Sequence, residues 1–318
     1  MALPRITPAG YRRITLFALV ALAFIVVTGA AVRLTGSGLG CTDWPTCEQG
    51  RLAPSEITDA PAMIEFANRL ITGLVSVAVV LAVTGAARRV PRRRDLVVLA
   101  AGLVAGVVAQ IVLGGLVVLF DLSPRLVMGH FLLSMVILWN ATVLHHRAGR
   151  PEGRPAPEVT PTVITFGRLA FAAAALVVFT GTVVTAAGPH AGDSQAARLQ
   201  LFVPDVARVH GAAVVILLAL TVALLVALRR EAAPAPAQRS ARVLLGVLLA
   251  QAAVGYTQYF TGVPALLVGI HVIGAVSVWI AVVRCNLALA EPGSASPGGL
   301  TASGAPADPA DARALAAT

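Results

Sequence analysis

Long apolar segments alternate with short polar stretches along most of this chain. Eight of the apolar segments are long enough to cross a hydrocarbon layer of about 30 Å at a helical rise of about 1.5 Å per residue. Their apolar character is continuous, whereas the strands of a membrane β-barrel alternate apolar and polar residues. The pattern therefore predicts an all-α polytopic membrane protein with eight transmembrane helices. We expect them near Ile14–Val32, Ile64–Ala87, Leu96–Phe120, Leu126–Leu144, Val163–Ala187, Val209–Leu228, Val243–Phe260 and Pro264–Val283.

Polar residues inside these segments recur at fixed spacings. One offset relates Gln110 and His130 to Gln251 and His271, since 251 − 110 = 141 and 271 − 130 = 141. A second match, between the Thr-Gly pairs that begin at Thr28 and Thr180, has an offset of 152. The chain therefore looks like a duplicated membrane unit with an intramembrane histidine in each copy.

The repeat predicts two four-helix bundles in the same orientation, because each copy has an even number of spans. We place the N-terminal half at 12–148 and the C-terminal half at 163–285. A cytoplasmic linker at 149–162 is rich in Pro and Gly, as extended connections are. Residues 291–318 hold almost no large apolar side chain, and we expect that tail to be disordered.

Composition agrees with a membrane protein, at 57% hydrophobic and 12% charged residues. All 24 basic residues are arginine, a usage typical of high-GC bacterial genomes, and the net charge is +9. Most arginines lie before the first span, after the second, fourth and sixth, and after the last. The positive-inside rule then places both termini on the cytoplasmic side of a bacterial plasma (inner) membrane. The excess of basic residues reflects the membrane topology, so we expect membrane lipid and no nucleic acid as a partner.

Three histidines lie near the outer ends of spans, and ionisable residues inside a membrane are functional by default. His210 and His271, on neighbouring helices of the C-terminal half, would form a pair that ligates heme iron axially. The N-terminal half offers only His130, because its counterpart of His210 is Asn68 (210 − 68 = 142). A heme iron in the C-terminal half would therefore have six ligands, whereas one in the N-terminal half would keep an open coordination position. The alternative is that all three are hydrogen-bonded helix contacts.

Other histidines have plainer interpretations. His145 and His146 adjoin Arg147 at the cytoplasmic end of a span, where we expect a solvated flank. His190 lies in a loop beside Gly188 and Pro189, which indicates a position at the surface or rim.

The outer segment from Arg33 to Cys47 holds several glycines and two cysteines. Cys41 and Cys47 are close enough for a small loop disulfide on the oxidising side. Two unpaired thiols and a redox-exchanging pair remain alternatives. Glu65, three residues before Asn68 on the same helical face, is a candidate acid–base catalyst, and an interfacial Glu65–Arg69 anchor is the alternative.

Arginines at the outer rim are candidates for binding heme propionates through charge-assisted hydrogen bonds, with snorkelling as the alternative. These propionate candidates are Arg33, Arg69, Arg125 and Arg208.

The chain resembles the heme A synthase family of membrane oxidoreductases from about Arg12 to Arg284. The resemblance rests on the string from Arg33 through Cys41 to Trp-Pro, on Glu65-Phe-Ala-Asn68-Arg69, and on the motifs around the three intramembrane histidines. It implies eight spans in two four-helix halves and outer-loop cysteines. It also implies an enzyme that oxidises the ring methyl of heme O to the formyl group of heme A, for assembly of a terminal oxidase.

By the resemblance, His210 and His271 bind the iron of a heme b cofactor, and the N-terminal half holds the substrate heme O, with His130 and, weakly, Asn68 at its iron. Glu65 matches the family's functional carboxylate. Asn68 is a departure, because the family pattern often has histidine there. A heme O synthase and an electron acceptor are the implied protein partners.

Two other function classes compete with this one. A b-type electron-transfer subunit linked to quinol would suit duplicated heme bundles, but the missing fourth histidine and the long glycine- and cysteine-containing loop do not suit it. A transporter would carry broken helices at mid-bilayer, whereas the polar positions here are peripheral.

Overall fold

The structure, a computed structural model, describes residues 5–151 and 159–290. Its regular elements in these residues are eight helices, all long and apolar enough to cross a membrane, which confirms the predicted all-helical, multi-pass membrane fold. The helices are α1 (Pro8–Leu34), α2 (Ala60–Arg88), α3 (Arg94–Leu119), α4 (Pro124–Ala148), α5 (Pro161–Ala187), α6 (Val203–Arg230), α7 (Ala235–Phe260) and α8 (Ala265–Leu289). The predicted tail (291–318) and half of the predicted linker (152–158) lie outside the described residues.

Several helices begin earlier than the apolar pattern predicts. Helix α6 begins at Val203 and not Val209, and α7 begins at Ala235 and not Val243. Apolar content marks only the part of a helix that lies in hydrocarbon, while helical hydrogen bonding continues into the polar interface. His210 consequently lies two turns inside α6, at the start of the apolar part of that helix.

Local sequence fixes where these helices start. The Thr7 hydroxyl caps α1 by accepting a hydrogen bond from Gly10 N–H, and the Asp59 carboxylate caps α2 by accepting from Ala62 N–H. A proline occupies the first turn of six of the eight helices. The starting residue of a helix sets the depth of every residue after it, including the candidate site residues.

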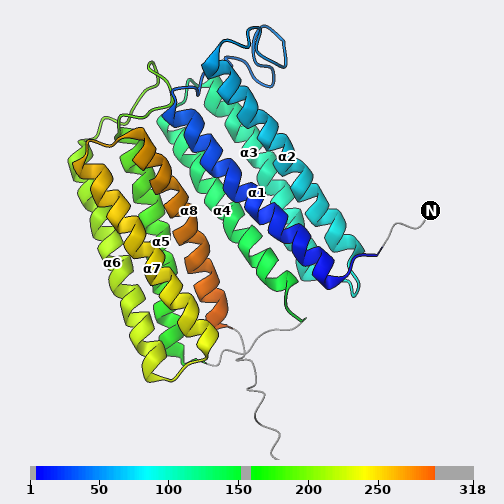
Figure 1. Ribbon diagram of the computed structural model, residues 1–318, viewed down its shortest axis with the longest axis vertical. Coiled ribbons are helices and arrows are strands. Elements are labelled where there is room, and N and C mark those ends of the chain that lie inside the picture. The colour runs from blue at the N-terminus through cyan, green and yellow to red at the C-terminus, as the bar shows by residue number, and fades with distance from the viewer. Residues whose placement is uncertain (1–4, 152–158, 291–318) are drawn as a thin grey trace, which may run out of the picture.

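The helices form two groups that lie side by side (Figure 1). Contacts run in the ring order α1–α2–α3–α4 in one group and α5–α6–α7–α8 in the other. Helices α2 and α4 therefore occupy opposite corners of the first group, as α6 and α8 do of the second. The groups meet where α8 contacts α1 and α4 and where α4 contacts α5.

Specific bonds fix the junction between the groups. The buried Trp279 indole on α8 donates a hydrogen bond to Met135 O on α4 at 2.7 Å, and its ring lies 5.3 Å from that of Phe171. At the C-terminal end of α1, the Arg33 guanidinium donates to His190 O at 2.6 Å and to Thr185 O at 2.9 Å. These contacts hold the two groups in one arrangement.

Candidate functional site

His210 and His271 face each other across the second helix group. Their ring centroids are 6.5 Å apart with an interplanar angle of 66°. The sequence-based expectation placed them on neighbouring helices, but α6 and α8 are at opposite corners of the ring. That correction strengthens the case for a ligand between them, because opposite corners leave the bundle centre between the two imidazoles.

The separation suits two imidazoles on one iron. Metal–histidine bonds are about 2.0 Å long, so rings bound to opposite sides of one metal have centres about 6 Å apart. The Thr180 hydroxyl donates to Leu176 O at 2.9 Å, so it accepts from His210 Nδ1–H, which lies 3.1 Å away. The Nε2 lone pair of His210 is thereby left for a metal.

The imidazoles lie against glycines of the preceding helices. A Cβ at Gly181 would lie 3.1 Å from Cε1 of His210, and one at Gly255 would lie 3.0 Å from Cε1 of His271. The Nδ1 atom of His271 is buried and has no hydrogen-bond partner among the described residues. A bundle centre that lies between two facing imidazoles, one of which has an Nδ1 without a partner among the described residues, is suited to hold a metal between the rings.

Two glutamines bind the helical turns that carry His130 and His271. The Gln251 amide on α7 donates to His271 O at 2.8 Å, and the Gln110 amide on α3 donates to His130 O at 3.0 Å. Gln110 also lies 2.5 Å from the hydroxyl of Ser134. The sequence showed the recurrence of these residues but not their function, which is to lock one helix against the next at the depth of the histidine.

The first helix group has a similar arrangement with a different side chain. The Thr28 hydroxyl donates to Asn68 Oδ1 at 2.8 Å, where Thr180 contacts His210 in the second group. His130, on the opposite helix α4, lies beside Gly114, and its buried Nδ1 atom has no hydrogen-bond partner among the described residues. The fold thus brings His210 and His271 together as a facing pair and places Asn68 and His130 on opposite helices of the first group.

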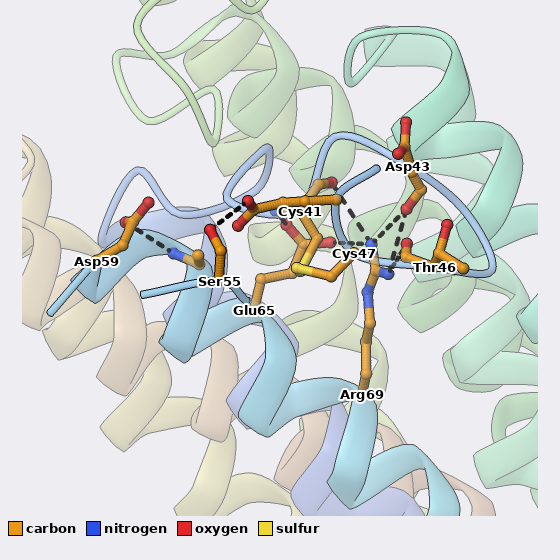
Figure 2. The surroundings of a disulfide bond; sticks show 10 residues. Cys41, Asp43, Thr46, Cys47, Ser55, Asp59, Glu65 and Arg69 are labelled. Carbon is orange, nitrogen blue, oxygen red and sulfur yellow. Dashed lines mark hydrogen bonds and ion pairs between the residues drawn. A yellow bond between two sulfur atoms is a disulfide. The ribbon is translucent and has the colours of Figure 1, made fainter. Parts of the chain in front are cut away.

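The outer loop folds over the start of α2 as one unit with Glu65 (Figure 2). Cys41 and Cys47 form a disulfide and are fully buried. Glu65 is also buried: its carboxylate accepts from Cys41 N–H at 2.7 Å and from the Arg69 guanidinium at 2.6 Å. Arg69 donates further to Asp43 O and Thr46 O. Glu65 is therefore buried beneath the loop in the second turn of α2, where it forms an ion pair with Arg69.

Gly40 explains why the loop can approach α2 so closely. A Cβ at this position would lie 2.4 Å from the backbone of Pro61, in the first turn of the helix. Only glycine permits that contact. The contact places the neighbouring Cys41 N–H against the Glu65 carboxylate, so the loop is anchored at two adjacent residues.

The rim arginines separate into two classes. Arg33 and Arg69 are bound to backbone carbonyls and, for Arg69, to Glu65. Arg125 is exposed at the start of α4. Arg208 is exposed on α6, and its ion-pair partner among the described residues is Asp205 at 2.7 Å. Of the four propionate candidates, Arg125 and Arg208 are therefore the more accessible.

The remaining histidines contact protein groups away from the bundle centres. His190 lies at the rim as expected, with Nε2 2.9 Å from Val263 O. His145 is half-buried and lies 3.1 Å from the Thr15 hydroxyl, so the expectation of a solvated flank is wrong for this residue. Helix packing of α1 on α4 covers it, which the local sequence does not reveal.

Comparison with known proteins gives a consistent result. The chain matches the family described as cytochrome oxidase assembly protein (COX15-CtaA) over residues 12–283. It is 34% identical over 120 residues to a protein of Lysinibacillus sphaericus named heme A synthase, a match covering 37% of this chain and 38% of the relative. A heme A synthase of Shouchella clausii is 30% identical over 157 residues, covering 48% and 50%. The matched part thus spans half or less of each of these relatives.

Proposed function

The chain belongs to the COX15-CtaA family of cytochrome oxidase assembly proteins, and from this premise we propose that it is a heme A synthase. In that reaction the ring methyl of heme O is oxidised to the formyl group of heme A. The observation that supports this proposal most directly is the pairing of two unlike sites in similar bundles. One has two facing histidines, and the other has a histidine, an asparagine and a buried carboxylate one turn away.

We further propose that the two helix groups are copies of one unit in the same orientation, with both termini in the cytoplasm. The support is the recurrence of two contacts. The Gln–His contact recurs at an offset of 141 for both residues, and the Thr–Asn/His contact recurs at 152 for the threonine and 142 for its partner. The arginine distribution supports the orientation.

In this proposal His210 and His271 bind heme b. A bound heme b would supply one-electron transfer. The protein residues do the rest: Thr180 fixes the tautomer of His210, Gln251 holds the His271 turn, and Gly181 and Gly255 let the rings approach the bundle centre. A quinol-linked electron-transfer subunit would use two comparable histidine pairs, so the His130–Asn68 site disfavours that alternative.

The first group would bind heme O, with His130 toward its iron. Oxidation of a methyl group releases protons at the reacting carbon. Glu65 is the only buried carboxylate among the described residues, and it lies one helical turn outward of Asn68. We propose that it accepts a proton there, with Arg69 and Cys41 N–H holding its carboxylate in place.

The test compares Glu65→Gln with Arg69→Met. Glutamine keeps a hydrogen-bonding group for Cys41 N–H but is not basic, whereas methionine removes the cation and leaves the carboxylate. General acid–base help is worth about 10²–10⁴ in rate. We expect Glu65→Gln to keep bound heme O and make little heme A, as measured by chromatography of extracted hemes normalised to heme b.

A purely structural role for Glu65 gives a different pattern. Both variants would then loosen the loop and lose bound heme O to a similar extent. Wild-type heme A levels in Glu65→Gln would show that this carboxylate takes no part in the chemistry.

A further inference from the structure

One position near the bundle centres carries His210 in the second group and Asn68 in the first. In both groups a threonine of the preceding helix binds this side chain. Thr180 and Thr28 hold corresponding places on α5 and α1, and each also lies within hydrogen-bond distance of the carbonyl three residues earlier: Val177 O at 3.1 Å and Ile25 O at 3.2 Å. Thr180 contacts the ring of His210, and Thr28 contacts the carboxamide of Asn68. The threonine thus orients whichever residue occupies this position.

The shorter side chain leaves space that the imidazole fills in the other group. A Cβ added at Gly181 would meet His210 at 3.1 Å, whereas a Cβ added at Gly29, the residue after Thr28, would meet no described atom within 4 Å. An imidazole at position 68 could occupy this space, but a carboxamide does not reach so far. The space at Gly29 is therefore open in the first bundle, whereas the corresponding space at Gly181 is filled by His210 in the second.

The carboxamide also offers a directed donor to this space. Asn68 Oδ1 accepts the Thr28 hydroxyl at 2.8 Å, which leaves the Nδ2 amide for another partner. Among the described residues Nδ2 donates no hydrogen bond, and Oδ1 is the side-chain atom of Asn68 that is bound. A neutral amide has two N–H donors and is a poor ligand for iron compared with imidazole.

Resting on the proposed function, we propose that the first-group heme is bound through His130 alone and that Asn68 donates a hydrogen bond to a small ligand at the open iron position. The ligand class is a water-sized or diatomic molecule with an acceptor atom. Asn68 is then a ligand-positioning residue at the substrate site, in the place where the second group has an iron ligand.

Carbon monoxide is a suitable probe, because it binds ferrous heme only where one axial position is free. The full-length protein, purified with heme in both groups, is reduced and titrated with carbon monoxide. We expect one carbon monoxide per two hemes in the wild type. His210→Asn should open the second group and raise the ratio toward two per two hemes.

Two substitutions at position 68 distinguish the effect of the open space from the effect of the hydrogen-bond donor. Asn68→His should close the site, which abolishes carbon monoxide binding and converts the first-group heme to a low-spin, six-coordinate spectrum. Asn68→Leu should retain binding but shift the bound carbon monoxide stretching frequency upward in the infrared, since the amide donor is lost. The Gly29 space makes the histidine variant compatible with folding, and its own heme spectrum reports on whether it folds.

Other outcomes would overturn the proposal. Absence of carbon monoxide binding in the wild type means that the first-group iron is already six-coordinate. An unchanged stretching frequency in Asn68→Leu removes the donor role. Heme A formation is measured in the same preparations: a protein that makes heme A but binds no carbon monoxide contradicts this inference alone, and one that binds carbon monoxide but makes no heme A contradicts only the proposed function.

Discussion

Gly274 on α8 tests whether the glutamine contact at His271 holds the second bundle together. A Cβ at this position would lie 1.7 Å from Gln251 Oε1, far inside van der Waals contact. In Gly274→Ala the flexible amide must therefore swing away, and its 2.8 Å hydrogen bond to His271 O is lost. We predict weaker binding of the second-group heme, because α7 no longer fixes the turn that carries a ligand.

The magnitude follows from the kind of bond. An interhelical hydrogen bond in a membrane protein contributes about 0.6 kcal/mol on average and up to about 1.7 kcal/mol. Leaving a buried amide without a partner costs about 1–3 kcal/mol. Gly274→Ala should then destabilise the heme-bound bundle by about 1–3 kcal/mol, which corresponds to roughly a 5- to 150-fold loss of heme affinity if the whole effect falls on binding.

Gln251→Ala provides the matching half of a double-mutant cycle. Once the amide is absent, the alanine at position 274 has nothing to displace, so the double variant should be less impaired than the sum of the single variants. Heme absorbance is followed during thermal unfolding in detergent. Gly246→Ala is the control, since a Cβ at this α7 position meets nothing within 4 Å.

Additive effects of Gly274→Ala and Gln251→Ala would refute this reasoning. A Gly274→Ala protein that loses heme no faster than Gly246→Ala would refute it as well.

Two further predictions concern the histidines and the loop. Replacing His210 or His271 with Ala should each remove the low-spin heme b spectrum, while His145→Ala, whose ring contacts α1, should leave it intact; a low-spin spectrum that persists in both core variants contradicts the assignment. Mass mapping without reductant should find one peptide linking Cys41 and Cys47, and since closing so short a loop stabilises by only about 2–3 kcal/mol, a Cys41→Ala protein should still insert in the membrane. Free alkylation of both thiols in fresh membranes would contradict the bridge.

The number and order of the helices follow from the sequence because each span must satisfy its backbone hydrogen bonds within itself. Continuous apolar runs therefore report on spans one at a time. Helix ends are less predictable, because residues such as Asp205 on α6 and Gln238 on α7 are polar yet remain helical outside the hydrocarbon. Side-chain caps from Thr7 and Asp59 mark the starts of α1 and α2, whereas the other six helices start without such a cap.

The sequence identified candidate residues for the site but not their arrangement. The spacing of the histidines and glutamines identified the polar positions inside the membrane. It did not show that α6 and α8 are opposite corners, because helix order in a bundle depends on packing between segments far apart in the chain. The burial of Glu65 likewise depends on a contact with Cys41, 24 residues earlier, which the glycine at position 40 makes possible.

The distribution of differences between the two helix groups argues for a division of labour. At an offset of 142, Glu65, Asn68 and Arg69 correspond to Ala207, His210 and Gly211 (65 + 142 = 207, 68 + 142 = 210, 69 + 142 = 211). All three changes fall on little more than one turn of α2 and α6, at the depth of the facing histidine. The contacts that hold the histidine turns, from Gln110 and Gln251, are the same in both groups. Since the glutamine contacts are retained while these three side chains are exchanged, the differences fit the proposed function, in which the second group holds a heme tightly and the first presents a heme for reaction.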